Sequence, residues 1–130
     1  MAVTFARWIL LLCALSAFVA FVGGFADVFA SANDQKIVEL WRLFGFIVFA
    51  GIFVLLALKP TRYVGIWELV IFHKLAMTVS AIFLIQESVE GAGVVAWVDG
   101  SLAVLLIVSY FLTKSYAAWN TFLQKTNTQP

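Results

Sequence analysis

The stretch YVGIWELVIFHKLAMTVSAIFLI, residues 63–85, decides the fold of this chain. It is mostly apolar, and only Glu68, His73 and Lys74 within it can carry a charge near neutral pH. A helix rises about 1.5 Å per residue and the hydrocarbon core of a bilayer is about 30 Å thick, so about 20 such residues span it. A spanning strand would need alternating polarity, which is missing here. Because lipid offers no hydrogen-bond partners to backbone groups, the stretch is predicted to be a transmembrane helix.

The rest of the chain has the same character. Hydrophobic residues make up 64% of the sequence and charged residues 12%, and the mean hydropathy is +1.04. A soluble fold of this composition could not cover its own surface. Charges divide the chain into apolar stretches at residues 8–29, 38–58, 63–85 and 93–113, joined by short links that favour antiparallel neighbours. We predict one all-α domain over residues 1–130, an integral membrane four-helix up-down bundle with short loops.

Local signals predict where the helices end. Pro60 cannot donate a backbone hydrogen bond and restrains Lys59 away from helical geometry, so it is expected to end the second helix. Ser31, Asn33 and Asp34 are suitable N-cap residues for that helix. The chain closes with a polar tail at residues 120–130, whose last six residues are expected to be disordered.

The distribution of charge predicts the orientation, because Lys and Arg collect in short cytoplasmic loops. One side of the predicted bundle carries Arg7, Lys59, Arg62, Lys114 and Lys125, and the other carries Asp27, Asp34, Glu39, Glu87 and Glu90 with Lys36. Aromatic rings that prefer the headgroup zone stand near helix ends: Trp8, Trp41, Tyr63, Trp67, Trp97, Tyr116 and Trp119. We expect a multi-pass protein of the inner cell membrane with both termini in the cytoplasm.

The first apolar run has a competing interpretation. Arg7, the run itself and Ala30-Ser31-Ala32 together imitate a secretory signal with a small-residue cleavage site. The run exceeds the about 7 to 15 residues of a signal core, so we interpret it as the first transmembrane helix.

Several functional classes find no support in the sequence. A net charge of +1 with scattered basic residues gives no basic stripe for nucleic acid. The single cysteine, Cys13, excludes an intrachain disulfide and a CxxC redox centre, and with one distant histidine it makes no metal site. No catalytic or nucleotide-binding motif proposes an enzyme. No cofactor is predicted, although haem or quinone stays open.

Small residues at four-residue spacing mark two helix faces that could pack closely in lipid. They are Ser16, Ala20 and Gly24 in the first helix and Ala92, Ala96 and Gly100 in the last. Packing inside one bundle is the simpler interpretation, and the seam of a homo-oligomer is the alternative.

Ionisable groups inside a membrane are costly and need a partner. Lys74 falls near the midplane, and Glu68 is about 120° around the same helix and about 9 Å away, too far to neutralise it. Asp99 is the nearest acid on a neighbouring helix, with a depth gap of about 10 Å. Arg42 matches Asp99 better in depth, so we predict an Arg42–Asp99 pair, as a structural contact or as an outer gate or ligand clamp. Arg42 bonded to Glu39 is the alternative.

Three residues are candidates for ligand binding or proton relay: Glu68, His73 and Lys74. His73 could be a neutral core imidazole bonded to Ser80 or Ser16, a proton relay, or an axial haem ligand. Haem ligation by two histidines would need a second chain, because this chain has one. A lysine in an apolar environment loses its charge more readily, which favours proton exchange.

The chain resembles the small bacterial DoxX-like membrane proteins over its second to fourth helices, on the fragments RLFG at residues 42–45 and AGIF at residues 50–53. The resemblance implies a four-helix bundle that sometimes serves as an accessory subunit of a redox or quinone-related system, and it carries over no catalytic residue. Small multidrug transporters share the helix count but depend on a midplane carboxylate in the first helix, whereas Asp27 falls at that helix's outer end.

These observations favour a non-enzymatic accessory or structural subunit, or a bundle that binds a small lipophile with a buried polar cluster of Arg42, His73, Lys74 and Asp99. One alternative is a proton-coupled small-molecule transporter or channel that acts as an oligomer and uses His73 and Lys74. The other is a haem- or quinone-associated redox subunit. The expected partners are the lipid bilayer and a homo-oligomer or larger membrane complex.

Overall fold

A computed structural model describes residues 1–127 of the chain, with side chains as far as Gln124. Over these residues the regular structure is entirely helical, with the elements α1 (Ala2–Ala30), α2 (Lys36–Leu58), α3 (Ile66–Gln86), α4 (Ala92–Leu112), η1 (Ser115–Ala117) and α5 (Ala118–Asn127). Helices α1 to α4 are each long and apolar enough to cross a membrane, as predicted from the sequence. The largest difference in bounds is in α1, which begins at Ala2 rather than at residue 8.

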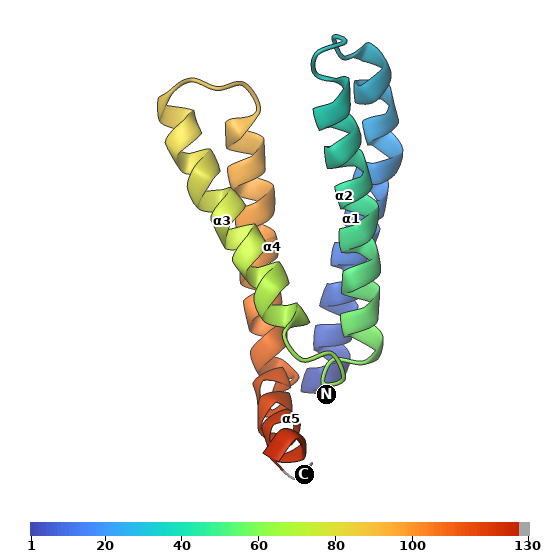
Figure 1. Ribbon diagram of the computed structural model, residues 1–130, viewed down its shortest axis with the longest axis vertical. Coiled ribbons are helices and arrows are strands. Elements are labelled where there is room, and N and C mark those ends of the chain that lie inside the picture. Colours follow the sequence, from blue (N-terminus) through green and yellow to red (C-terminus); the bar gives the residue numbers. More distant parts are fainter. Residues whose placement is uncertain (128–130) are drawn as a thin grey trace.

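The four long helices form two hairpins, one of α1 and α2 and one of α3 and α4 (Figure 1). The N-terminus, the α2–α3 connection and α5 lie at one end, called the proximal end below. The connections at residues 31–35 and 87–91 lie at the opposite, distal end. The hairpins meet toward the proximal end, and their ribbons diverge toward the distal end (Figure 1).

The apolar core lies in the proximal half, where all four helices contribute to it. Small residues on α1 and α2 let these helices approach closely, and the rings of Phe53 and Trp67 fill the space between the hairpins. The buried cluster comprises Leu10, Cys13, Ala14, Ala17, Ala50, Phe53, Leu56, Ala57, Trp67, Val70 and Leu106.

The α2–α3 connection is held by the carbonyl of Pro60. Helix α2 ends at Leu58, as Pro60 predicts. The Pro60 carbonyl accepts hydrogen bonds from Trp67 Nε1 at 2.8 Å and from Ser115 Oγ at 2.9 Å. Gly65 then begins α3 with φ of 87°, a left-handed conformation that a residue without Cβ adopts without strain. The connection is thereby fastened to α3 and to the segment after α4.

The two small-residue faces pack within their own hairpins. A Cβ added to Gly24 would lie 3.0 Å from Leu43 of α2, and one added to Gly100 would lie 3.3 Å from Thr78 of α3. Ala92 is buried, Ala20 and Ala96 are half-buried, and Ser16 is exposed. Gly24 and Gly100 are therefore the closest-packed members of the two faces.

Two local predictions are wrong. None of Ser31, Asn33 and Asp34 caps α2, which starts after Gln35 without a side-chain cap, while the Ser31 hydroxyl bonds back to the Val28 carbonyl at 2.9 Å. Residues 125–127, predicted to be disordered, belong to α5. The remaining tail residues, 128–130, lie outside the described residues.

Candidate functional site

The central feature of the site is a buried ion pair between the helices of the second hairpin. Lys74 Nζ on α3 lies 2.6 Å from Asp99 Oδ1 on α4, and the two residues are only 6% and 8% exposed. Each charge thus finds its partner away from solvent, as the cost of an isolated charge in an apolar medium requires. Each residue is about two turns from the nearer end of its helix.

The predicted Arg42–Asp99 pair is wrong. Arg42 Nη2 instead lies 2.8 Å from Asp27 Oδ2 on α1 and 2.5 Å from Glu39 Oε2, three residues earlier on its own helix. The physical reason is that charges pair inside each hairpin, where the helices pack side by side. Asp99 matches Arg42 in depth, and Arg42 lines one groove with the distal part of α4, but α4 packs against α3, whose Lys74 pairs with Asp99.

Close backbone approach beside the pair allows it to form. Gly100, next to Asp99, faces the Thr78 side chain, with 3.3 Å from an added Cβ to Thr78 Cγ2. Thr78 Oγ1 donates to the Lys74 carbonyl at 2.7 Å, which turns its methyl group toward α4. Gly100 and the hydrogen-bonded Thr78 side chain let α3 and α4 approach closely. Lys74 therefore reaches Asp99 although the two residues lie at different depths along their helices.

Phe49 of α2 connects the ion pair to the first hairpin. The Lys74 ammonium lies 4.3 Å from the centroid of the Phe49 ring, a cation–π distance. The His73 ring contacts the same phenylalanine, with 4.6 Å between ring centroids. Phe49 was not a candidate in the sequence, because a phenylalanine in an apolar helix carries no signal of such a role.

His73 is exposed on the surface of α3, and its ring lies against Phe49 of α2. Consecutive helical residues are about 100° apart, so Lys74 and His73 cannot both face α4. The predicted hydroxyl partners are not at hand: Ser80 is exposed, and Ser16 donates to the Cys13 carbonyl at 2.8 Å. Of the predicted cluster, Lys74 and Asp99 form an ion pair. His73 contacts the Phe49 ring that Lys74 also contacts, and Arg42 forms no ion pair with Asp99.

A groove of about 390 Å³ begins near the ion pair and runs to the distal end. Its wall on α3 includes Met77 and Ala81, three and seven residues beyond Lys74 and so on the same helix face. On α4 it includes Ala92 and Val95, seven and four residues before Asp99. The polar lining comes from Arg42, Ser80 and Glu90, and Leu84, Val89, Gly91 and Val94 complete it.

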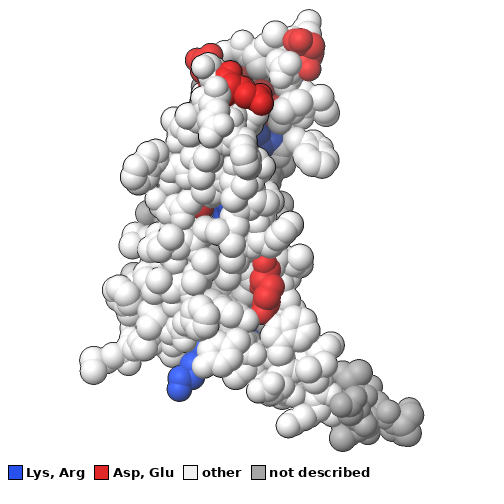
Figure 2. Space-filling view, turned by 90° about the vertical axis from the view of Figure 1, so that its left-hand side faces the viewer, with Lys and Arg blue, Asp and Glu red and all other residues white. Residues whose placement is uncertain are grey.

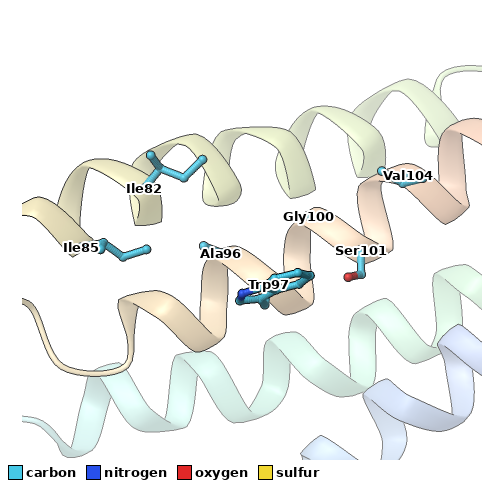
Figure 3. A pocket seen from close by; sticks show the side chains of 7 residues that line it. All are labelled: Ile82, Ile85, Ala96, Trp97, Gly100, Ser101 and Val104. Carbon is cyan, nitrogen blue, oxygen red and sulfur yellow. The ribbon is translucent and has the colours of Figure 1, made fainter.

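A second hollow, of about 440 Å³, lies between α3 and α4 and carries no charged side chain. Figure 3 shows Trp97 beside the small residues Ala96 and Gly100 of α4, with Ile82 and Ile85 on α3. Ser101 and Val104 complete its lining. This hollow offers a ligand almost only apolar contact, whereas the distal groove combines apolar walls with ionisable groups.

Glu68, a candidate for ligand binding or proton relay, lies apart from the Lys74–Asp99 pair and is hydrogen-bonded at the proximal end. Its Oε1 accepts hydrogen bonds from the Tyr110 hydroxyl at 2.5 Å and from Trp119 Nε1 at 2.7 Å. The carboxylate therefore links α3 to α4 and α5 near the proximal end. Trp119 was missed as a polar partner because the sequence does not show where the segment after α4 folds back, and Tyr110, which lies inside α4, was also missed.

Over the described residues, no group of three or more His, Cys, Asp or Glu side chains is arranged to hold a metal ion. Comparison of the chain with protein-family models, with curated proteins and with solved structures gave no match. The arrangement itself defines the class: a chain with four potential membrane-crossing helices and a buried ion pair beside a groove.

Proposed function

We propose that this chain is a non-enzymatic multi-pass membrane protein that binds a small lipophilic molecule in the distal groove, as an accessory subunit or carrier. In this proposal the helices form an up-down bundle in the inner cell membrane with the proximal end in the cytoplasm. Supporting this orientation, Arg7, Lys59, Arg62 and Lys114 all fall at the proximal end. Figure 2 shows acidic side chains gathered at the distal end, above a mostly uncharged band.

The observation that carries the proposal is the buried Lys74–Asp99 pair, about one helical turn from Met77 and Val95, which line a groove between three helices. An ion pair is costly to bury and adds little net stability by itself, so its retention beside a groove favours a role in binding. Ligand sites are mostly apolar with a few convergent polar groups, and about 390 Å³ is within their usual range. A single ring system or part of one acyl chain fits these dimensions.

The proposal is tested by filling the groove. Val95 lines it, while Val98 on the same helix is 53% exposed and lies outside it, so Val95→Phe and Val98→Phe form a matched pair. Wild type and V98F, purified in mild detergent, are expected to retain a small lipophile in native mass spectrometry, and V95F is expected to lose most of it. If wild type carries no small molecule, or V95F carries as much as V98F, the proposal fails.

A second candidate is proton-coupled transport, and the ion pair favours it because it joins an acid and a base that could exchange protons beside a groove open at one end. The variant carrying Lys74→Met and Asp99→Leu removes both charges and leaves neither unpaired. Reconstituted in liposomes, it should lose pH-driven flux of a lipophilic substrate that the wild type carries. Equal flux in both would eliminate this relay.

An absorbance scan of the same protein separates lipophile binding and proton-coupled transport from a haem-bearing redox subunit, which would show a Soret band.

A further inference from the structure

A cavity at the proximal end lies apart from the distal groove and the ion pair. It has a volume of about 500 Å³ and is enclosed by the α2–α3 connection on one side and by η1 and α5 on the other. Its polar lining consists of Arg62, Thr61 and Thr121, and its apolar lining of Val64, Ala117, Ala118 and Phe122. One cation, two hydroxyls and an apolar wall thus surround a single space.

Within the part of the chain that the structure describes, the charge of Arg62 has no counterpart. Among the described residues no carboxylate forms an ion pair with it, and its backbone N–H donates to the Lys59 carbonyl. Glu68, the nearest acid along the chain, already accepts hydrogen bonds from Tyr110 and Trp119. The other acidic residues belong to the distal half, so the guanidinium is left available for an anion from outside the chain.

The chemistry of this lining matches a phosphodiester attached to an acyl chain. A guanidinium presents paired donors that suit phosphate oxygens, and threonine hydroxyls can donate to the same group. Val64 and Phe122 offer contact to the glycerol and the first methylenes. The cavity adjoins the start of α3, where a spanning helix leaves the hydrocarbon core and phosphates are concentrated.

We infer that this cavity binds the phosphate headgroup of an anionic phospholipid, with Arg62 as the anchoring cation and Thr61 and Thr121 as hydroxyl donors. Basic pockets on the cytoplasmic side of membrane proteins bind acidic headgroups, and surrounding Lys and Arg attract them. Lys59 and Lys114 supply such surrounding charge without lining the cavity. The inference does not depend on the ligand of the distal groove.

The test compares phosphatidylglycerol with phosphatidylcholine, added to the full chain in mild detergent and measured by native mass spectrometry. Wild type is expected to retain phosphatidylglycerol in clear preference. Arg62→Gln should weaken that retention about tenfold, because it loses both the charge and the paired donors. Lys59→Gln removes an equal charge outside the cavity and should weaken it about twofold or less. Arg62→Lys keeps the positive charge but loses the paired N–H donors of the guanidinium, so its retention of phosphatidylglycerol should fall between those of R62Q and K59Q.

Three outcomes would overturn the inference. Equal losses of phosphatidylglycerol retention in R62Q and K59Q would show that the lipid is attracted by the positive charge of the whole proximal end and not by this cavity. Equal retention of the two lipids by wild type would remove the role of headgroup charge. Displacement of the lipid by millimolar inorganic phosphate, with phosphate retained in its place, would assign the cavity to a free anion. Because Arg62 is exposed, all three variants are expected to fold, which thermal unfolding of the same samples checks.

Discussion

The proximal and distal halves of the molecule are held together in different ways. In the proximal half, buried apolar side chains from all four long helices interlock, and hydrogen bonds to Pro60 and Glu68 fasten the connections around them. In the distal half the hairpins diverge, and contacts between helices combine close packing within each hairpin, at Gly24 and Gly100, with the ion pairs of Lys74 and of Arg42. Because apolar burial gives little drive between helices in lipid, both halves depend on close packing, and the distal half adds ion pairs between helices.

The largest effect should come from breaking the buried pair. Asp99→Leu leaves Lys74 as an uncompensated buried charge and is expected to lower the free energy of unfolding by about 3–5 kcal/mol. Adding Lys74→Met should restore most of that loss, since no lone charge remains. Unfolding in mixed micelles with an anionic detergent, followed by circular dichroism, measures both. A double variant as unstable as the single one would show that the pair's attraction, and not the orphaned charge, is what matters.

Next in size is the close approach beside the pair. Gly100→Leu places a large side chain where Thr78 already lies 3.3 Å from an added Cβ, so α3 and α4 must separate. Overpacking of this kind costs about 1–3 kcal/mol. Gly93→Leu on the same helix is the control, because an added Cβ at Gly93 meets nothing within 4 Å. Equal unfolding midpoints for the two variants would contradict the close packing described.

A smaller and local effect is expected at the proximal end. Glu68→Gln weakens the acceptor shared by Tyr110 and Trp119 and should cost about 1 kcal/mol or somewhat more. Because the loss falls on the attachment of α5, amide hydrogen exchange should rise there and stay unchanged in α1. Glu87→Gln, an exposed acid at the distal end, is the control. Unchanged exchange in α5 would mean that other contacts hold this helix.

The smallest effect should follow Arg42→Gln. Its guanidinium is 48% exposed and the Asp27 carboxylate 61% exposed, so solvent weakens the pair, and the expected loss is about 0–1 kcal/mol. The loss should shrink further in high salt. A destabilisation as large as that of D99L, measured in the same micelles, would show that the distal half depends on Arg42 and not on the buried pair.

Hydropathy and short connections were sufficient to predict the four long helices, since lipid leaves the backbone no alternative to helix and short links leave few arrangements. The partner of Asp99 was not predictable in the same way. Depth along the axis favoured Arg42 and the neighbouring helix favoured Lys74, and it is the neighbour within the hairpin that pairs. The outward position of His73 could have been inferred, because Lys74 next to it takes the face toward α4.

The doubly hydrogen-bonded carbonyl of Pro60 has a consequence for how the molecule can move. It joins the connection between the hairpins to Trp67 on one side and to Ser115 on the other, so this end resists separation. Any opening that admits a ligand from the distal end would then be a rotation of one hairpin relative to the other about this fixed end, and the Lys74–Asp99 pair would move within one of them, the α3–α4 hairpin.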